Sequence, residues 1–184
     1  LVLATNENDI LSRFFNTGIY STGTVVPTLS PSMDIQVATN FARYLYYKVG
    51  GDATRLNALM KDFAQTGKLQ VGGTPVDPLF RAGAGDTAAT LATIRRYWQD
   101  HRYLLDPHTA VGVAVGESHL ENDAPMICLA TAHPAKFPQA IQDATGEDLA
   151  HHPTLDALAT APTRCDVLPN DEQAVRNYVA ERAT

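Results

Sequence analysis

The chain has 184 residues, of which 45% are hydrophobic and 18% charged, a composition typical of one soluble globular core. Its formal net charge of −6 disfavours nucleic acid as a partner, because phosphate binding needs clustered Lys and Arg. No apolar run approaches the ~20 residues that span a bilayer, and no signal peptide is evident. Two cysteines, Cys128 and Cys165, are expected to be reduced core residues, so we predict a cytoplasmic protein.

Residues 1–31 begin with the strand–loop–helix unit from which parallel α/β sheets are built. Residues 1–5 form an apolar run with β character, and a chain that opens within a strand indicates a piece of a longer protein. Helix caps at 6–9 precede apolar residues at helical spacing, and Gly18 ends this helix. Residues 18–32 are rich in Gly, Ser, Thr and Pro and are expected to be a loop.

Residues 32–102 are predicted to be mostly helical. The expected helices run from Ser32 or Asp34 to Gly50, from Asp52 to Gly67, and from Asp86 to about Arg102. A short strand-like stretch at 68–71 and a Gly/Pro-rich connection separate the last two helices. Because these helices interrupt the α/β pattern, we interpret them as an insertion or subdomain.

After residue 102 the α/β pattern resumes. Pro107 follows Asp106 and is predicted to be the first residue of a helix. The amide of a first helical residue makes no hydrogen bond within the helix, so proline, which has no amide hydrogen, loses nothing there. The further elements expected are a strand at 126–131, a helix at 139–145 closed by Gly146, a strand at 165–168 and a terminal helix capped by Asn170 or Asp171. Residues 147–163 show no clear pattern.

Thr131 is the first candidate for a ligand contact. It ends the predicted strand at 126–131, and ligands of open α/β sheets bind at the carboxyl ends of the strands. Its hydroxyl could hydrogen-bond a heterocyclic nitrogen without adding charge. The alternative is that Thr131 is a turn former or cap, a common role for threonine.

Three motifs carry a resemblance to a known family. They are S-P-S-M-D-I-Q at 30–36, D-P-H-T-A-V-G at 106–112 and A-T-A-H-P-A-K-F at 130–137. Together they resemble the C-terminal part of threonine synthase, a pyridoxal-phosphate enzyme of the tryptophan-synthase-like fold, type II. The resemblance implies an α/β fold with a mostly helical insertion. Residues 1–31 and 103–184 would then belong to the cofactor-binding domain and residues 32–102 to the insertion, with the N-terminal catalytic half absent.

The same resemblance implies roles for particular residues. Thr131 would face the pyridine nitrogen of pyridoxal 5'-phosphate. The Schiff-base lysine of the family lies in its N-terminal half, upstream of Leu1, so we expect no catalytic residue in this chain and a structural role for Lys136. The substrate-side candidates are Asn6, Asn8, Ser30 and Ser32. The alternative is that these four are loop caps that satisfy backbone donors.

We predict no metal site, because the histidines and cysteines do not stand at ligand spacing. The activity implied for the parent enzyme is conversion of O-phosphohomoserine and water to threonine and phosphate, the last step of threonine biosynthesis. The chain alone is expected to be inactive and to need the missing N-terminal half. The alternatives are another type II lyase, such as a threonine dehydratase or a cysteine synthase-like protein, and a non-catalytic oligomerisation or regulatory module.

Overall fold

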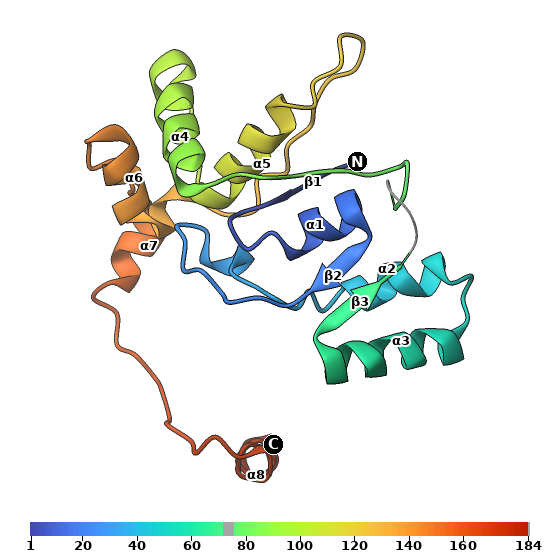
Figure 1. Ribbon diagram of the computed structural model, residues 1–184. Coiled ribbons are helices and arrows are strands. Elements are labelled where there is room, and N and C mark those ends of the chain that lie inside the picture. Colours follow the sequence, from blue (N-terminus) through green and yellow to red (C-terminus); the bar gives the residue numbers. More distant parts are fainter. Residues whose placement is uncertain (72–75, 184) are drawn as a thin grey trace. The chain divides into compact units, whose positions relative to one another are not determined.

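The computed structural model describes residues 1–71 and 76–183 (Figure 1). The chain divides into two compact units, Leu1–His151 and His152–Thr184. In the first unit the elements are β1 (Val2–Thr5), α1 (Ile10–Thr17), β2 (Ile19–Ser21), η1 (Pro31–Met33), α2 (Phe41–Lys48), α3 (Ala53–Thr66), β3 (Lys68–Gln70), β4 (Arg81–Ala84), α4 (Thr87–His101), α5 (Pro107–Glu117), η2 (Pro134–Lys136) and α6 (Pro138–Thr145). The second unit contains α7 (Pro153–Leu158) and α8 (Glu172–Arg182).

A short parallel sheet lies between two helices of the first unit. β1 pairs with β4 in parallel, and Leu3 is opposite Ala82. Ala82 belongs to the core cluster that contains α1, whereas the next residue, Gly83, lies against Val115 of α5. Because successive strand residues point to opposite faces, α1 and α5 cover opposite faces of this sheet. This is the α/β layering predicted from the sequence, and the predicted fold class is confirmed.

The core beside α1 is largely aromatic. Phe14 packs edge-on against Phe41, with ring centroids 4.6 Å apart, and Tyr20 stacks on Phe41 at 4.1 Å. The Tyr20 hydroxyl also accepts a hydrogen bond of 2.8 Å from the amide of Ala38. Tyr20 lies in β2, which pairs antiparallel with β3, so this core fixes the small β2–β3 sheet next to α1 and α2.

A second, aliphatic core lies among α4, α5 and α6. Ile94, Ala110 and Ile141, one from each helix, are all fully buried. The helices begin and end where their sequences indicate: Asp86 and Asp106 cap α4 and α5, and Gly146 ends α6 in the left-handed conformation. The predicted helices after Asp52, Asp86, Asp106 and Phe137 are therefore confirmed.

Three local predictions in the first unit are wrong. The helix expected from Ser32 or Asp34 starts only at Phe41, because Asp34 is hydrogen-bonded to other segments and the chain forms only the short η1 there. β2 lies within the predicted loop at 18–32, where β3 pairs with it. β4 was not foreseen, since R-A-G-A lacks an apolar strand pattern and forms a strand by pairing with β1.

The division into a cofactor domain and a 32–102 insertion stays a prediction. The structure adds that β4, from within that range, pairs with β1. Part of the predicted Gly/Pro-rich connection, residues 72–75, lies outside the described residues. No helix in the described ranges is long and apolar enough to cross a membrane.

The second unit lacks the predicted strand at 165–168, which is irregular. Val167 is 93% exposed and Cys165 is also exposed, so the expectation that Cys165 is a core residue is wrong. Short apolar runs become strands only where a neighbouring strand supplies hydrogen-bond partners, and the described part of this unit contains none. The terminal helix α8 is present, and Asp171 caps it as expected.

Gly83 makes the close approach of β4 to α5 possible, and its substitution should destabilise the fold. A Cβ atom at Gly83 would lie 2.8 Å from Cγ1 of Val115, a buried β-branched residue with little freedom to turn away. We expect Gly83→Ala to lower the free energy of unfolding by about 1–3 kcal/mol in urea denaturation. The matched control is Gly85→Ala, whose new methyl would meet Val111 and Val115 at an ordinary 3.7 Å. Equal stabilities of the two variants would contradict the packing described.

Candidate functional site

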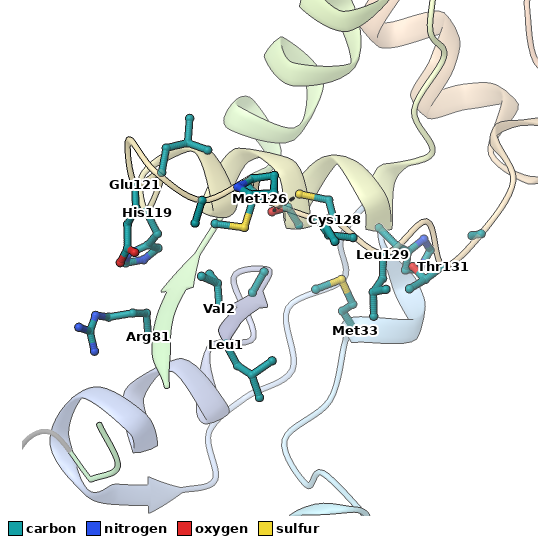
Figure 2. A pocket seen from close by; sticks show the side chains of 18 of the residues that line it. Leu1, Val2, Met33, Arg81, His119, Glu121, Met126, Cys128, Leu129 and Thr131 are labelled. Carbon is teal, nitrogen blue, oxygen red and sulfur yellow. Dashed lines mark hydrogen bonds between the residues drawn. The ribbon is translucent and has the colours of Figure 1, made fainter. Parts of the chain in front are cut away.

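The first unit contains a wide cavity of about 1170 Å³. Its walls come from β1, η1, residues 78–81 leading into β4, the first half of α5, the segment 119–132 and η2. Figure 2 shows Met33, Leu129 and Thr131 at one end of this cavity and Arg81, His119 and Glu121 at the other. Most of the lining between the two ends is apolar, as is usual for a site that holds an organic ligand.

The segment 126–131, predicted to be a strand, is irregular in the structure. Its side chains nevertheless alternate as in a strand: Met126 and Cys128 are partly covered by α5, whereas Ile127 and Leu129 are 80% and 79% exposed. A strand is defined by hydrogen bonds to a neighbour, and no strand of the described residues pairs with this segment. The strand prediction is therefore wrong for this chain, although the alternation that motivated it is real.

Thr131 lies on the wall of the cavity and is exposed to it. Its backbone amide donates a hydrogen bond of 3.3 Å to the hydroxyl oxygen of Thr109 in α5. None of the hydrogen bonds within residues 1–71 and 76–183 uses the Thr131 hydroxyl itself. The residue thus has an anchored backbone and a side chain that remains available for a ligand.

The structure separates the four substrate-side candidates. Ser32 lies in η1 and lines the cavity together with Thr131. Asn6, Asn8 and Ser30 are buried, with 1%, 2% and 1% of their surface exposed, and do not line it. Their role toward a substrate remains a prediction, and their observed contacts are within the protein.

Asp34, which is partly buried, is at the centre of these contacts. Its carboxylate accepts hydrogen bonds from the side-chain amides of Asn6, at 2.7 Å, and Asn8, at 3.1 Å. It also accepts from the amide and the hydroxyl of Thr28, at 2.8 and 2.6 Å. The polar network ties the loop after β2 to the end of β1. The local sequence around Asp34 predicts only a helix cap, because its long-range hydrogen bonds join segments that are distant along the chain.

Charged and titratable groups are few near Thr131. Lys136 is exposed in η2 and lines the cavity, and His108 lines it from the start of α5. No group of three or more His, Cys, Asp and Glu side chains in the described part of the chain could hold a metal ion. The Thr131 end of the cavity therefore offers hydroxyl, imidazole and ammonium groups beside apolar surface.

Comparison with known proteins gives consistent matches. A family model described as "Threonine synthase, C-terminal" matches residues 109–179. The threonine synthase of Pseudomonas aeruginosa is 40% identical over an alignment of 186 residues. This alignment covers 98% of this chain and 40% of that protein. The crystal structure of a PLP-bound threonine synthase from Brucella melitensis matches with a TM-score of 0.87 and a sequence identity of 40%. The match covers 98% of this chain and 40% of that chain. Yeast threonine synthase matches with a TM-score of 0.83 and 32% identity, over all of this chain and 42% of that structure.

The fold and the cavity define this chain as the C-terminal part of an α/β protein. In sequence and fold the chain matches the C-terminal part of threonine synthases. It spans about 40% of the length of the relatives that it matches.

Removing the Asp34 carboxylate should destabilise the loop that borders the site. Asp34→Ala leaves the buried amides of Asn6 and Asn8 without their charged acceptor. We expect the free energy of unfolding to fall by about 3 kcal/mol, measured by urea denaturation, because hydrogen bonds to a charged group are costly to lose. As a control, Asp62→Ala removes an exposed carboxylate from α3 and should change stability by less than about 0.5 kcal/mol. A loss from Asp34→Ala no larger than that of the control would contradict this role.

The two cysteines should differ in reactivity. Burial raises the pKa of the Cys128 thiol, and nearby Glu117 raises it further, so less of it is thiolate near pH 8. The thiolate is the reactive form, and Cys165 is exposed, so we expect Cys165→Ser to react with an aromatic disulfide reagent more slowly than Cys128→Ser. The rate of the Cys165→Ser variant should keep rising with pH beyond the ordinary thiol range. Equal rates and equal pH profiles would show that Cys128 is not buried against α5.

Proposed function

We propose that this chain is the C-terminal part of a threonine synthase that converts O-phosphohomoserine and water to threonine and phosphate. The observation that carries the proposal is the match of 98% of the chain, at 40% identity, to proteins of that name, with the Thr131 cavity inside the matched region. We further propose that residues 32–102 form an insertion in its cofactor domain. Both cysteines are free, which favours a reducing compartment such as the cytoplasm.

The residues of the cavity fit pyridoxal 5'-phosphate as the cofactor. The Thr131 hydroxyl faces the cavity without a partner among the described residues, and a hydroxyl can hydrogen-bond a pyridine nitrogen. The neighbouring side chains of Met33, Leu129 and Phe137 offer apolar surface for a planar ring. When bound, this cofactor supplies an electron sink for negative charge that develops on the substrate.

In this proposal the chain binds and orients and does not form the covalent bond to the cofactor. Thr131 holds the ring nitrogen through a neutral hydroxyl, which leaves that nitrogen largely unprotonated. Ser32 lies on the side where the substrate would enter, with Asn6, Asn8 and Ser30 supporting that loop from behind. The lysine that reacts with the cofactor belongs to the part of the enzyme that this chain does not represent, and Lys136 remains structural.

The cavity also fits the remainder of such an enzyme. Its volume of about 1170 Å³ exceeds the roughly 300–1,000 Å³ of an ordinary small-molecule site. The exposed side chains of Ile127 and Leu129 follow the alternation of a strand, and β1 pairs with β4 along one edge. We propose that strands of the remaining part lie between β1 and the segment 126–131 and complete the sheet over α5.

Turnover measurements test the proposed function. The isolated chain should form no threonine from O-phosphohomoserine. The enzyme that contains it, as one polypeptide or with a separately supplied N-terminal part, should release threonine and phosphate in equal amounts. Ammonia release from threonine is the control, because a threonine dehydratase would give that product instead. Turnover by the isolated chain, or ammonia release in place of phosphate, would overturn the proposal.

A further inference from the structure

A buried carboxylate at the start of α5 connects two separate segments that line the cavity. Asp106 is 2% exposed, and its Oδ1 accepts from the amides of His108 and Thr109 at 2.9 and 3.3 Å, the ordinary contacts of a helix cap. Two side-chain contacts go beyond capping. The Thr109 hydroxyl donates to Oδ2, and Nδ1 of His108 lies 3.2 Å from Oδ1. Asp106 therefore fixes the side chains of His108 and Thr109 as well as the helix start.

The Thr109 branch leads to Thr131. An ionised carboxylate can only accept, so the single hydroxyl hydrogen of Thr109 is donated to Asp106. The hydroxyl oxygen then accepts from the Thr131 amide, at 3.3 Å. The chain of hydrogen bonds has one direction, from Thr131 through Thr109 to Asp106, and a charged acceptor at its end strengthens it. It anchors the backbone of the residue whose hydroxyl faces the cavity.

The His108 branch leads to η1, which also lines the cavity. Nε2 of His108 accepts from the backbone amide of Ser32 at 3.3 Å, so this nitrogen carries no hydrogen. The ring hydrogen is then on Nδ1, where it points to Asp106. The imidazole is 8% exposed and packs against Phe137, with ring centroids 4.9 Å apart. One carboxylate thus anchors both Thr131 and Ser32, which lie far apart in sequence.

We propose that Asp106, acting through Thr109 and His108, is the positioning residue of this site. It sets the orientation of Thr131 toward the cofactor ring and the distance from Thr131 to the Ser32 loop on the substrate side. The inference rests on the proposed function, because it assigns Thr131 to the cofactor and Ser32 to the substrate. Small errors of position reduce catalysis strongly, so a buried charge that anchors two lining segments has a direct functional consequence.

The test uses the assembled enzyme that contains this chain and compares three variants of the Thr109 branch. Thr109→Val keeps the side-chain shape without the hydroxyl, Thr109→Ser keeps the hydroxyl, and Thr131→Val removes the proposed cofactor contact itself. We expect Thr109→Val to weaken pyridoxal phosphate binding about tenfold and to alter the absorption spectrum of the bound cofactor. Thr109→Ser should restore both. The melting temperature of each cofactor-free variant separates these effects from unfolding.

His108→Asn tests the second branch independently. The asparagine amide can still donate to Asp106, but its shorter side chain places no acceptor at the position where Nε2 of His108 meets the Ser32 amide. We expect the KM for O-phosphohomoserine to rise about tenfold, while kcat and the cofactor spectrum change little. If Thr109→Val does not fold, the KM of His108→Asn still tests the positioning role of Asp106.

The outcomes distinguish the two proposals. If Thr131→Val weakens cofactor binding but Thr109→Val and Thr109→Ser bind alike, the positioning role of Asp106 is wrong and the cofactor contact stands. If Thr131→Val leaves affinity and spectrum unchanged, the cofactor contact fails, and the positioning role fails with it. An unchanged KM in His108→Asn would overturn the connection to the substrate side.

Discussion

The buried carboxylate of Asp106 is the constraint on which the site depends. A charge removed from water is stable only when hydrogen-bond donors replace the water, and Asp106 finds them within the first turn of α5. Two of these donors, the side chains of His108 and Thr109, each hold a second segment of the chain. Satisfying one charge therefore orders two segments that line the cavity.

Helix α5 holds the site in place because β4 and the segment 126–131 both pack closely against it. Gly83 lets β4 lie against Val115, and Gly116 leaves room for Cys128 and Met126. Gly112, in contrast, has open space above its Cα and lines the cavity. The helix thus carries β1 and β4 on one side of the cavity and the segment 126–131 on the other, with unfilled volume between them.

The chemistry proposed for this chain follows from what its cavity contains. Beside Thr131 the groups are a hydroxyl, an imidazole held by Asp106 and one exposed ammonium, and no cluster suited to a metal is found among the described residues. Such groups orient a cofactor and a substrate. The covalent step and the closure of the cavity would come from the remaining part of the enzyme.

Sequence by itself determined the local features of this protein. The caps Asp52, Asp86, Asp106 and Asp171 and the stop at Gly146 could be predicted because a cap acts on amides only a few residues away. The motif around Thr131 could be recognised for the same reason. Only the tertiary structure decided that 81–84 is a strand, that 126–131 is not, and that Asp34 is the centre of a partly buried network. A strand and a carboxylate partly withdrawn from water both need partners from distant segments, and no local pattern specifies which segments those are.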